Sequence, residues 1–118
     1  MEYCFGNSNI FRRKNLMVKA GDKINGHKHN FDHVSEVKRG AVHLKATLPD
    51  GRIVEADCYA PTEPEYNGDN DYVLIRAGVE HEITALKDDT IFDCLYAHRT
   101  PQGDVIQTPY TGFREAYE

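Results

Sequence analysis

The sequence lacks any long hydrophobic run. Its first residues, MEYCFGNSNIFRRKN, contain no apolar stretch of signal-peptide length. No later segment approaches the roughly 20 apolar residues that a helix needs to cross a bilayer. We therefore expect a soluble, cytoplasmic protein without a membrane partner.

Closely spaced cysteines are also missing. The chain has three cysteines, Cys4, Cys58 and Cys94, and no CxxC pair. An odd number of widely separated cysteines argues against a disulfide framework and against a zinc ribbon. We expect reduced thiols, with Cys58 and Cys94 acting as small buried hydrophobic residues.

Positive charge is scarce as well. The chain has 14 Lys and Arg against 19 Asp and Glu, and its one basic cluster, Arg12 to Lys14, is too short for a nucleic-acid footprint. We therefore expect no nucleic-acid partner. With 118 residues, of which 40% are hydrophobic, the chain suits one domain with one core, residues 1–118.

Helical periodicity is absent too, because Gly, Pro, Asn or Asp interrupts the sequence about every ten residues. What the sequence does contain is about eight short strand candidates separated by turn residues. They are residues 15–21, 34–40, 41–48, 52–60, 71–78, 80–86, 90–99 and 104–110. This pattern predicts an all-β sandwich or barrel.

The segment 41–60 is the clearest hairpin. Val42 and Leu44 alternate with His43 and Lys45, so the hydrophobic residues should face the core and His43 should be a surface histidine. The segment 61–71 is rich in Pro, Gly and acidic residues, and it could be a lid over a barrel mouth or a surface loop.

Three of the six histidines lie in the stretch GHKHNFDH, residues 26–33. On an extended strand His27 and His29 project from one face and could bind one metal ion. His33 opens the next strand, where it shares a face with Ser35 and Val37, while Glu36 faces solvent. The alternative is that these histidines are unrelated surface or core residues.

The residue types restrict the metal. Neutral imidazoles suit a divalent transition metal such as Mn, Fe, Ni, Zn, Co or Cu, without choosing among them. Calcium is disfavoured because the sequence has no oxygen-rich loop. His81 follows a glycine turn but has no second histidine four residues on, so the zinc-protease pattern HExxH is absent.

Two further segments offer polar candidates. Tyr96 and His98 share a strand face with Phe92 and Cys94, and both could move protons if that face lines the barrel. Equally, Tyr96 could be a core residue and His98 a turn cap. Arg76 could bind a substrate carboxylate, or it could pair with Glu80 or Glu82 on the surface.

The histidine pattern resembles the first motif of the cupins, G(X)5HXH(X)3-4E(X)6G. Gly21, His27, His29 and Gly40 keep the spacing of that motif, and His33 stands at the position of its glutamate. The second motif, G(X)5PXG(X)2H(X)3N, is kept only in part. Gly78 and His81 match it, whereas Arg76 and Ala85 replace its proline and asparagine.

The resemblance implies a cupin double-stranded β-helix, a small jelly-roll barrel, with a core of about residues 16–98 and a C-terminal extension of 99–118. It also implies a divalent metal held by His27, His29, His33 and His81, and a homodimer.

The expected function is that of a metal-dependent enzyme acting on a small, oxygen-rich substrate. The chemistry would be that of a dioxygenase, hence an oxidoreductase, or a Lewis-acid isomerase or lyase, with Tyr96 and His98 as catalytic residues. The alternative is a non-catalytic cupin module that binds a small ligand or a metal.

Overall fold

The computed structural model describes residues 2–4, 10–28, 32–97, 102 and 112–114. All regular elements in this part of the chain are β-strands, so none of it forms a helix that could span a membrane. The strands are β1 (Glu2–Cys4), β2 (Ile10–Met17), β3 (Lys23–His27), β4 (His33–Arg39), β5 (Ala41–Thr47), β6 (Ile53–Tyr59), β7 (Tyr72–Ile75), β8 (Glu80–Ala85), β9 (Thr90–Ala97) and β10 (Gly112–Arg114). The predicted all-β class is confirmed.

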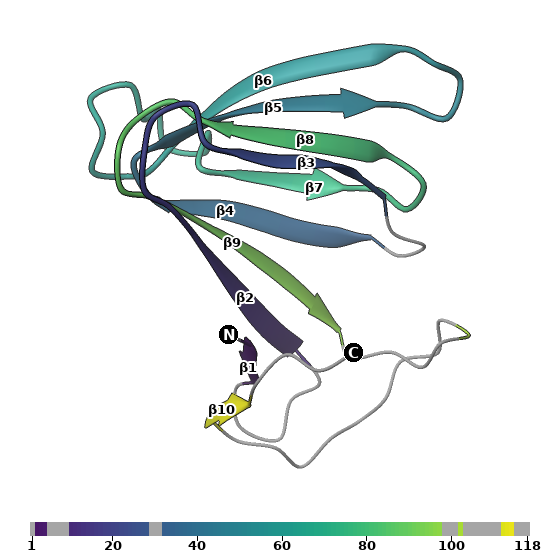
Figure 1. The fold of residues 1–118 in the computed structure, drawn as a ribbon, viewed down its shortest axis with the longest axis horizontal. Helices are drawn as coiled ribbons and strands as arrows, with labels where there is room; N and C mark the ends of the chain where they lie inside the picture. Colours follow the sequence, from purple (N-terminus) through teal and green to yellow (C-terminus); the bar gives the residue numbers. More distant parts are fainter. Residues whose placement is uncertain (1, 5–9, 29–31, 98–101, 103–111, 115–118) are drawn as a thin grey trace.

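The strands form two antiparallel sheets. One sheet has the order β10-β1-β2-β9-β4-β7, and the other has the order β3-β8-β5-β6. Figure 1 shows that the two sheets lie close together at one end and spread apart toward the other. We call these the closed end and the open end of the sandwich.

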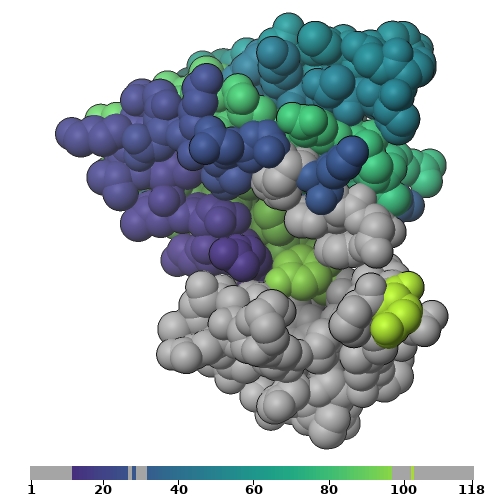
Figure 2. Space-filling model, turned by 45° about the vertical axis from the view of Figure 1, so that its right-hand side comes forward, coloured from purple at the N-terminus to yellow at the C-terminus, as the bar shows by residue number. Residues whose placement is uncertain are grey.

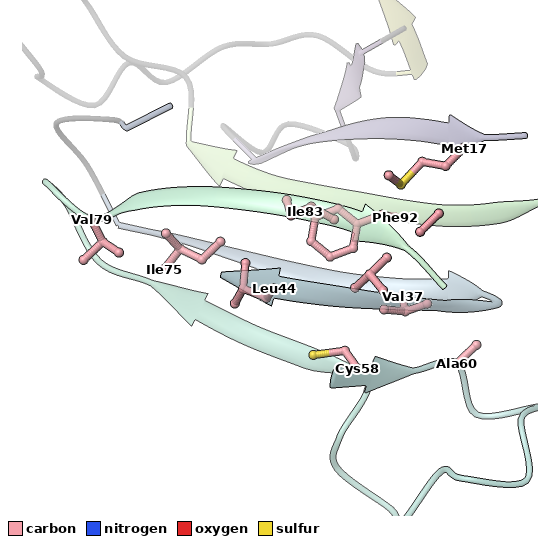
Figure 3. Packing of buried hydrophobic residues seen from close by; sticks show 11 residues of the cluster. Met17, Val37, Leu44, Cys58, Ala60, Ile75, Val79, Ile83 and Phe92 are labelled. Carbon is pink, nitrogen blue, oxygen red and sulfur yellow. The ribbon is translucent and has the colours of Figure 1, made fainter. Parts of the chain in front are cut away.

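Side chains from the facing sides of both sheets make one hydrophobic core (Figure 3). Val37 and Phe92 come from the six-stranded sheet, and Val42 and Ile83 come from the four-stranded sheet. Alternate residues of each strand point inward, as the strand period of two requires. The predicted inward face of the hairpin at 41–60 is thus confirmed at Val42 and Leu44, which are both buried.

Several strand boundaries differ from the sequence prediction. The first predicted strand, 15–21, is β2, which ends at Met17 because a turn with Gly21 at φ +93° follows. The short strands β1 and β10 were not predicted, and they pair with each other at one edge of the six-stranded sheet. β10 lies within the segment expected as a C-terminal extension, and the predicted strand 104–110 lies outside the described residues.

The segment 61–71 is a surface loop at the closed end, as Figure 1 shows between β6 and β7. Lys87 pairs with Glu63 and Glu65 of this loop. The backbone N–H of Val37 donates to the carbonyl of Asp71 at 2.7 Å. Because the loop is held at this end, it does not cover the open end, and the lid interpretation is wrong.

A close approach between two turns holds the closed end together. Gly40 connects β4 to β5 with φ +78°, and a Cβ at this position would lie 2.3 Å from the hydroxyl oxygen of Thr90. The Thr90 hydroxyl accepts the N–H of Ala41 at 3.3 Å and donates to the carbonyl of Lys87 at 2.8 Å. Only glycine fits both the conformation and the space at this position.

We expect Gly40→Ala to destabilise the fold strongly, because it adds a steric conflict with Thr90 to the cost of a left-handed residue. Gly51→Ala is the matched control, since Gly51 has φ +90° and an added methyl group there would meet nothing within 4 Å. The control should cost about 1–2 kcal/mol, and Gly40→Ala should cost about 1–3 kcal/mol more. Urea unfolding measures both, and equal losses would contradict the close-packing account.

Candidate metal centre

Three of the predicted metal ligands lie where strands begin or end at the open end. β3 ends at His27, β4 begins at His33, and His81 is the second residue of β8. The antiparallel register pairs His27 with His81 within the four-stranded sheet. His33 belongs to the opposite sheet, so the site spans the interior between them.

His33 and His81 meet across this interior. Their ring centroids are 5.4 Å apart with an interplanar angle of 54°, and the residues are 5% and 1% exposed. Two imidazoles that bind one ion through nitrogen at about 2.1 Å have ring centroids roughly 5 Å apart. The pair therefore has a separation that suits a shared metal ion.

A backbone carbonyl fixes which ring nitrogen of His81 carries the hydrogen. Its Nδ1 lies 3.1 Å from the carbonyl oxygen of Val79. Because a carbonyl only accepts, Nδ1 carries the hydrogen, and the lone pair of the neutral ring is on Nε2. A hydrogen bond of this kind orients a metal-binding histidine and sets its tautomer.

The other two predicted ligands are placed only in part. The backbone of His27 lies beside that of His81, whereas His29 lies outside the described residues. Among the side chains that the structure describes, no group of three or more metal-binding residues comes together. The set of four histidines therefore stays a prediction that rests here on the His33–His81 pair.

Tyr96 lies near His33 on the inner side of the six-stranded sheet. In β9, Phe92 is a core residue, and Tyr96 shares its face. The ladder between β4 and β9 pairs Val34 with Leu95, so Tyr96 lies across from the beginning of β4. His98, the second catalytic candidate, lies outside the described residues.

A layer of polar side chains lies next to His33 on the inner face, two residues further toward the closed end. Ser35 donates to the sulfur of Cys94 at 3.4 Å, and the side-chain amide of Asn15 lies 3.9 Å from the same sulfur. Burial raises the pKa of Cys94, while the Ser35 hydrogen bond and the charge of Arg13 lower it less. Burial also raises the pKa of Cys58, so both thiols are protonated at neutral pH.

Asp32, the residue before His33, anchors the start of β4. The sequence did not reveal this role. Its carboxylate accepts the N–H of Ala77 at 2.7 Å and pairs with Arg76 at 3.3 Å. The partner of Arg76 is thus Asp32 and neither Glu80 nor Glu82. Arg76 is 70% exposed, so its role here is to tie the turn before β8 to the start of β4.

A second arrangement that sequence reasoning missed lies on the outer side of the six-stranded sheet. Arg12 forms ion pairs with Asp93 at 2.7 Å and with Glu36 at 3.3 Å. Asp93 is only 4% exposed in its side chain, although strand alternation places it on the outer face. Glu36 lies on the outer face, as expected, and these contacts leave its side chain 22% exposed.

His43 lies apart from the candidate site, on the outer side of the four-stranded sheet. Its Nδ1 is 2.6 Å from Asp57 and its Nε2 is 2.9 Å from Glu55. The hydrogen bond to Asp57, followed by that to Glu55, raises the pKa of His43 above 6.5. The prediction of a surface histidine is confirmed, and both ring nitrogens have carboxylate partners.

Comparison with solved structures identifies the fold. An oxalate decarboxylase variant from Bacillus subtilis aligns with a TM-score of 0.63 and 14% sequence identity, over 83% of this chain and 24% of that chain. KdgF from Halomonas sp. aligns with a TM-score of 0.62 and 14% identity, over 86% of this chain and 79% of that chain. These neighbours are cupins, so the predicted jelly-roll fold is confirmed.

The fold occurs in other settings as well. CENP-C of Drosophila melanogaster, solved bound to CAL1, aligns with a TM-score of 0.56 and 11% identity, over 76% of this chain and 65% of that chain. No family model and no curated protein sequence matches the chain. Since the chain spans only about a quarter of the oxalate decarboxylase chain, at low identity, these likenesses show the fold alone.

The paired His43 predicts a distinct pH dependence. Because its folded pKa is raised above the unfolded value, its contribution to stability is complete below pH 6.5 and is lost as the pH rises through the folded pKa. In an NMR titration His43 should titrate above 6.5, and Asp57→Asn should bring its pKa down. Asp50→Asn, which removes a distant turn carboxylate, should leave it unchanged, and a His43 pKa insensitive to Asp57→Asn would contradict the pairing.

Proposed function

We propose that this protein is a metal-dependent enzyme that acts on a small, oxygen-rich molecule at the open end of the sandwich. The observation that carries the proposal is the buried His33–His81 pair, in which two imidazoles from opposite sheets lie 5.4 Å apart. The fold shared with oxalate decarboxylase and KdgF supports it. Buried histidines grouped at the mouth of a barrel are a common basis for metal catalysis.

In this proposal His27, His29, His33 and His81 hold one divalent transition metal, with Mn, Fe, Ni, Zn, Co and Cu as candidates. When bound, such an ion supplies a Lewis-acid centre or a redox centre. The four imidazoles are neutral, so the ligand set does not compensate the charge of the ion. A site of this kind favours substrates with anionic oxygens.

The residues around the pair would shape the reaction. Ile75, the register partner of His33, and Val79, which precedes His81 by two residues, are both buried and provide an apolar wall. An apolar wall limits access of water to the reacting atoms. Tyr96 and His98 are the proposed catalytic residues, and the Tyr96 hydroxyl would give or take a proton at a substrate oxygen or carbon.

Two reaction classes fit this arrangement, a dioxygenase reaction and a Lewis-acid isomerase or lyase reaction. We also propose that the protein works in the cytoplasm as a homodimer with a small-molecule substrate.

The second candidate function is a non-catalytic module that binds a small ligand or a metal. One observation favours a binding role, since CENP-C, which has a similar fold, was solved bound to CAL1.

The metal content tests the first step of the proposal. Protein purified without a histidine tag should contain about one divalent ion per chain by elemental analysis. His81→Ala should lose most of the ion, and His43→Ala should keep it, because His43 lies on the outer side of the sheet. His81→Gln serves as a second variant of similar size, and thermal melting checks that each variant is folded. Wild-type protein that takes up no metal would contradict the proposal.

Turnover separates the enzyme from the binding module. Metal-loaded protein should consume oxygen or form product from a panel of diketones, uronates and small acids. Tyr96→Phe should lower the rate by about 10²–10⁴-fold, as expected for loss of a proton-transfer group, without changing the metal content. Tyr59→Phe, on the surface strand β6, is the matched control. Thermal stabilisation by a panel member without any turnover would favour the binding module.

A further inference from the structure

One row of register partners crosses the four-stranded sheet through His81. His81 pairs with His27 of β3 on one side and with Ala46 of β5 on the other. Ala46 in turn pairs with Val54 of the edge strand β6. Register partners project from the same face of a sheet, so Ala46 and Val54 face the interior together with His81. On the β6 side of His81 this row is therefore apolar.

Val54 is an inward-facing hydrophobic residue that the fold leaves uncovered. Cys58, on the same face of β6, is 4% exposed and belongs to the core, whereas Val54 is 53% exposed. Ala56, which lies between them on this face, is exposed as well. The uncovered part is where β6 begins, at the open end of the sandwich (Figure 1). Exposed apolar surface beside buried polar groups is typical of a ligand site.

The six-stranded sheet also places a hydrophobic residue beside its histidine on this side. Its edge strand β7 contributes Ile75, which is the register partner of His33 and is buried. β7 follows β6 in the chain, and β6 contacts β4 across the interior, so the edges β6 and β7 lie on the same side of the sandwich. Figure 2 brings the open end forward and shows the teal atoms of β6 above the green atoms of the segment 72–81. Both histidines of the pair thus have apolar neighbours toward this side.

The inward-facing residues Ala46, Val54 and Ala56 form what we call the apolar arm of the site. The backbone of Val54 lies two strand spacings, about 10 Å, from that of His81. The two alanines carry only a methyl group each, so they leave space above the sheet between His81 and Val54. A ligand whose head is held at the histidines and whose chain has several carbon atoms fits this length.

We propose that the apolar arm determines specificity by binding an alkyl chain of the substrate, while the oxygen atoms of the substrate face the His33–His81 pair. The substrate class is then an oxo acid or ketone with an apolar tail. Uronates, which carry hydroxyl groups along their length, are disfavoured. The placement of the oxygen atoms rests on the proposed metal-dependent function. The contact with the alkyl chain does not, because the burial of methylene groups drives it with or without a metal.

The test is a calorimetric titration with 2-oxopropanoate and 2-oxooctanoate, which share one head and differ only in the length of the alkyl chain. Metal-loaded and chelator-treated wild-type protein are both titrated. We expect 2-oxooctanoate to bind about tenfold more tightly or better, since each buried methylene group is worth about fourfold in affinity. Val54→Gln should remove most of this preference and leave the binding of 2-oxopropanoate unchanged. Val54→Leu, which keeps the residue apolar, should retain the preference.

Ile53→Gln is the matched control. Ile53 precedes Val54 on the same strand and is 56% exposed, but it faces the outer side of the sheet. This variant should keep the wild-type preference for the long chain. Because both positions are exposed, each variant should fold, and thermal melting checks that it does.

The outcomes separate this inference from the proposed function. Equal affinity of wild type for the two acids, no binding of 2-oxooctanoate, or a preference that survives Val54→Gln would each overturn the inference, even in protein that takes up metal and turns over other substrates. A preference for the long chain that depends on Val54, in protein that takes up no metal, would support the apolar arm while the metal-dependent function fails.

Discussion

The close packing of the two sheets at the Gly40 turn is the constraint on which the rest of the structure depends. Gly40 joins β4 of one sheet to β5 of the other, and the Thr90 hydroxyl at the start of β9 bonds to the backbone of Ala41 and of Lys87. Three strands are thereby held together at one end. The sheets spread toward the other end, where β4 and β8 begin, and His33 and His81 meet in the space between them.

Strand alternation then sorts the charged groups of the six-stranded sheet. On the outer side, Arg12 and Asp93 satisfy each other, which compensates for the burial of a carboxylate that would otherwise be costly. On the inner side, the polar side chains of Ser35 and Cys94 form a neutral layer.

The sequence predicted much of this arrangement and missed what depends on neighbouring strands. The alternation within β4 and β5 correctly placed His33, Val37, Val42 and Leu44 inward, since a period of two follows from backbone geometry alone. Alternation could not show that Asp93 is buried, because its burial requires Arg12 from a strand about eighty residues away in sequence.

The turns and loops between strands also depend on contacts that the sequence does not show. The first strand was predicted too late in the sequence. The residues up to Gly21 were assigned to the strand, whereas they belong to the turn that follows it. The lid interpretation of 61–71 failed because the contacts of Lys87 fix that loop at the closed end.

The measurement that tests the central claim most directly is the X-ray absorption spectrum of the metal-loaded protein. The account predicts outer-shell scattering from several imidazole ligands, whereas a spectrum of oxygen ligands alone would contradict it.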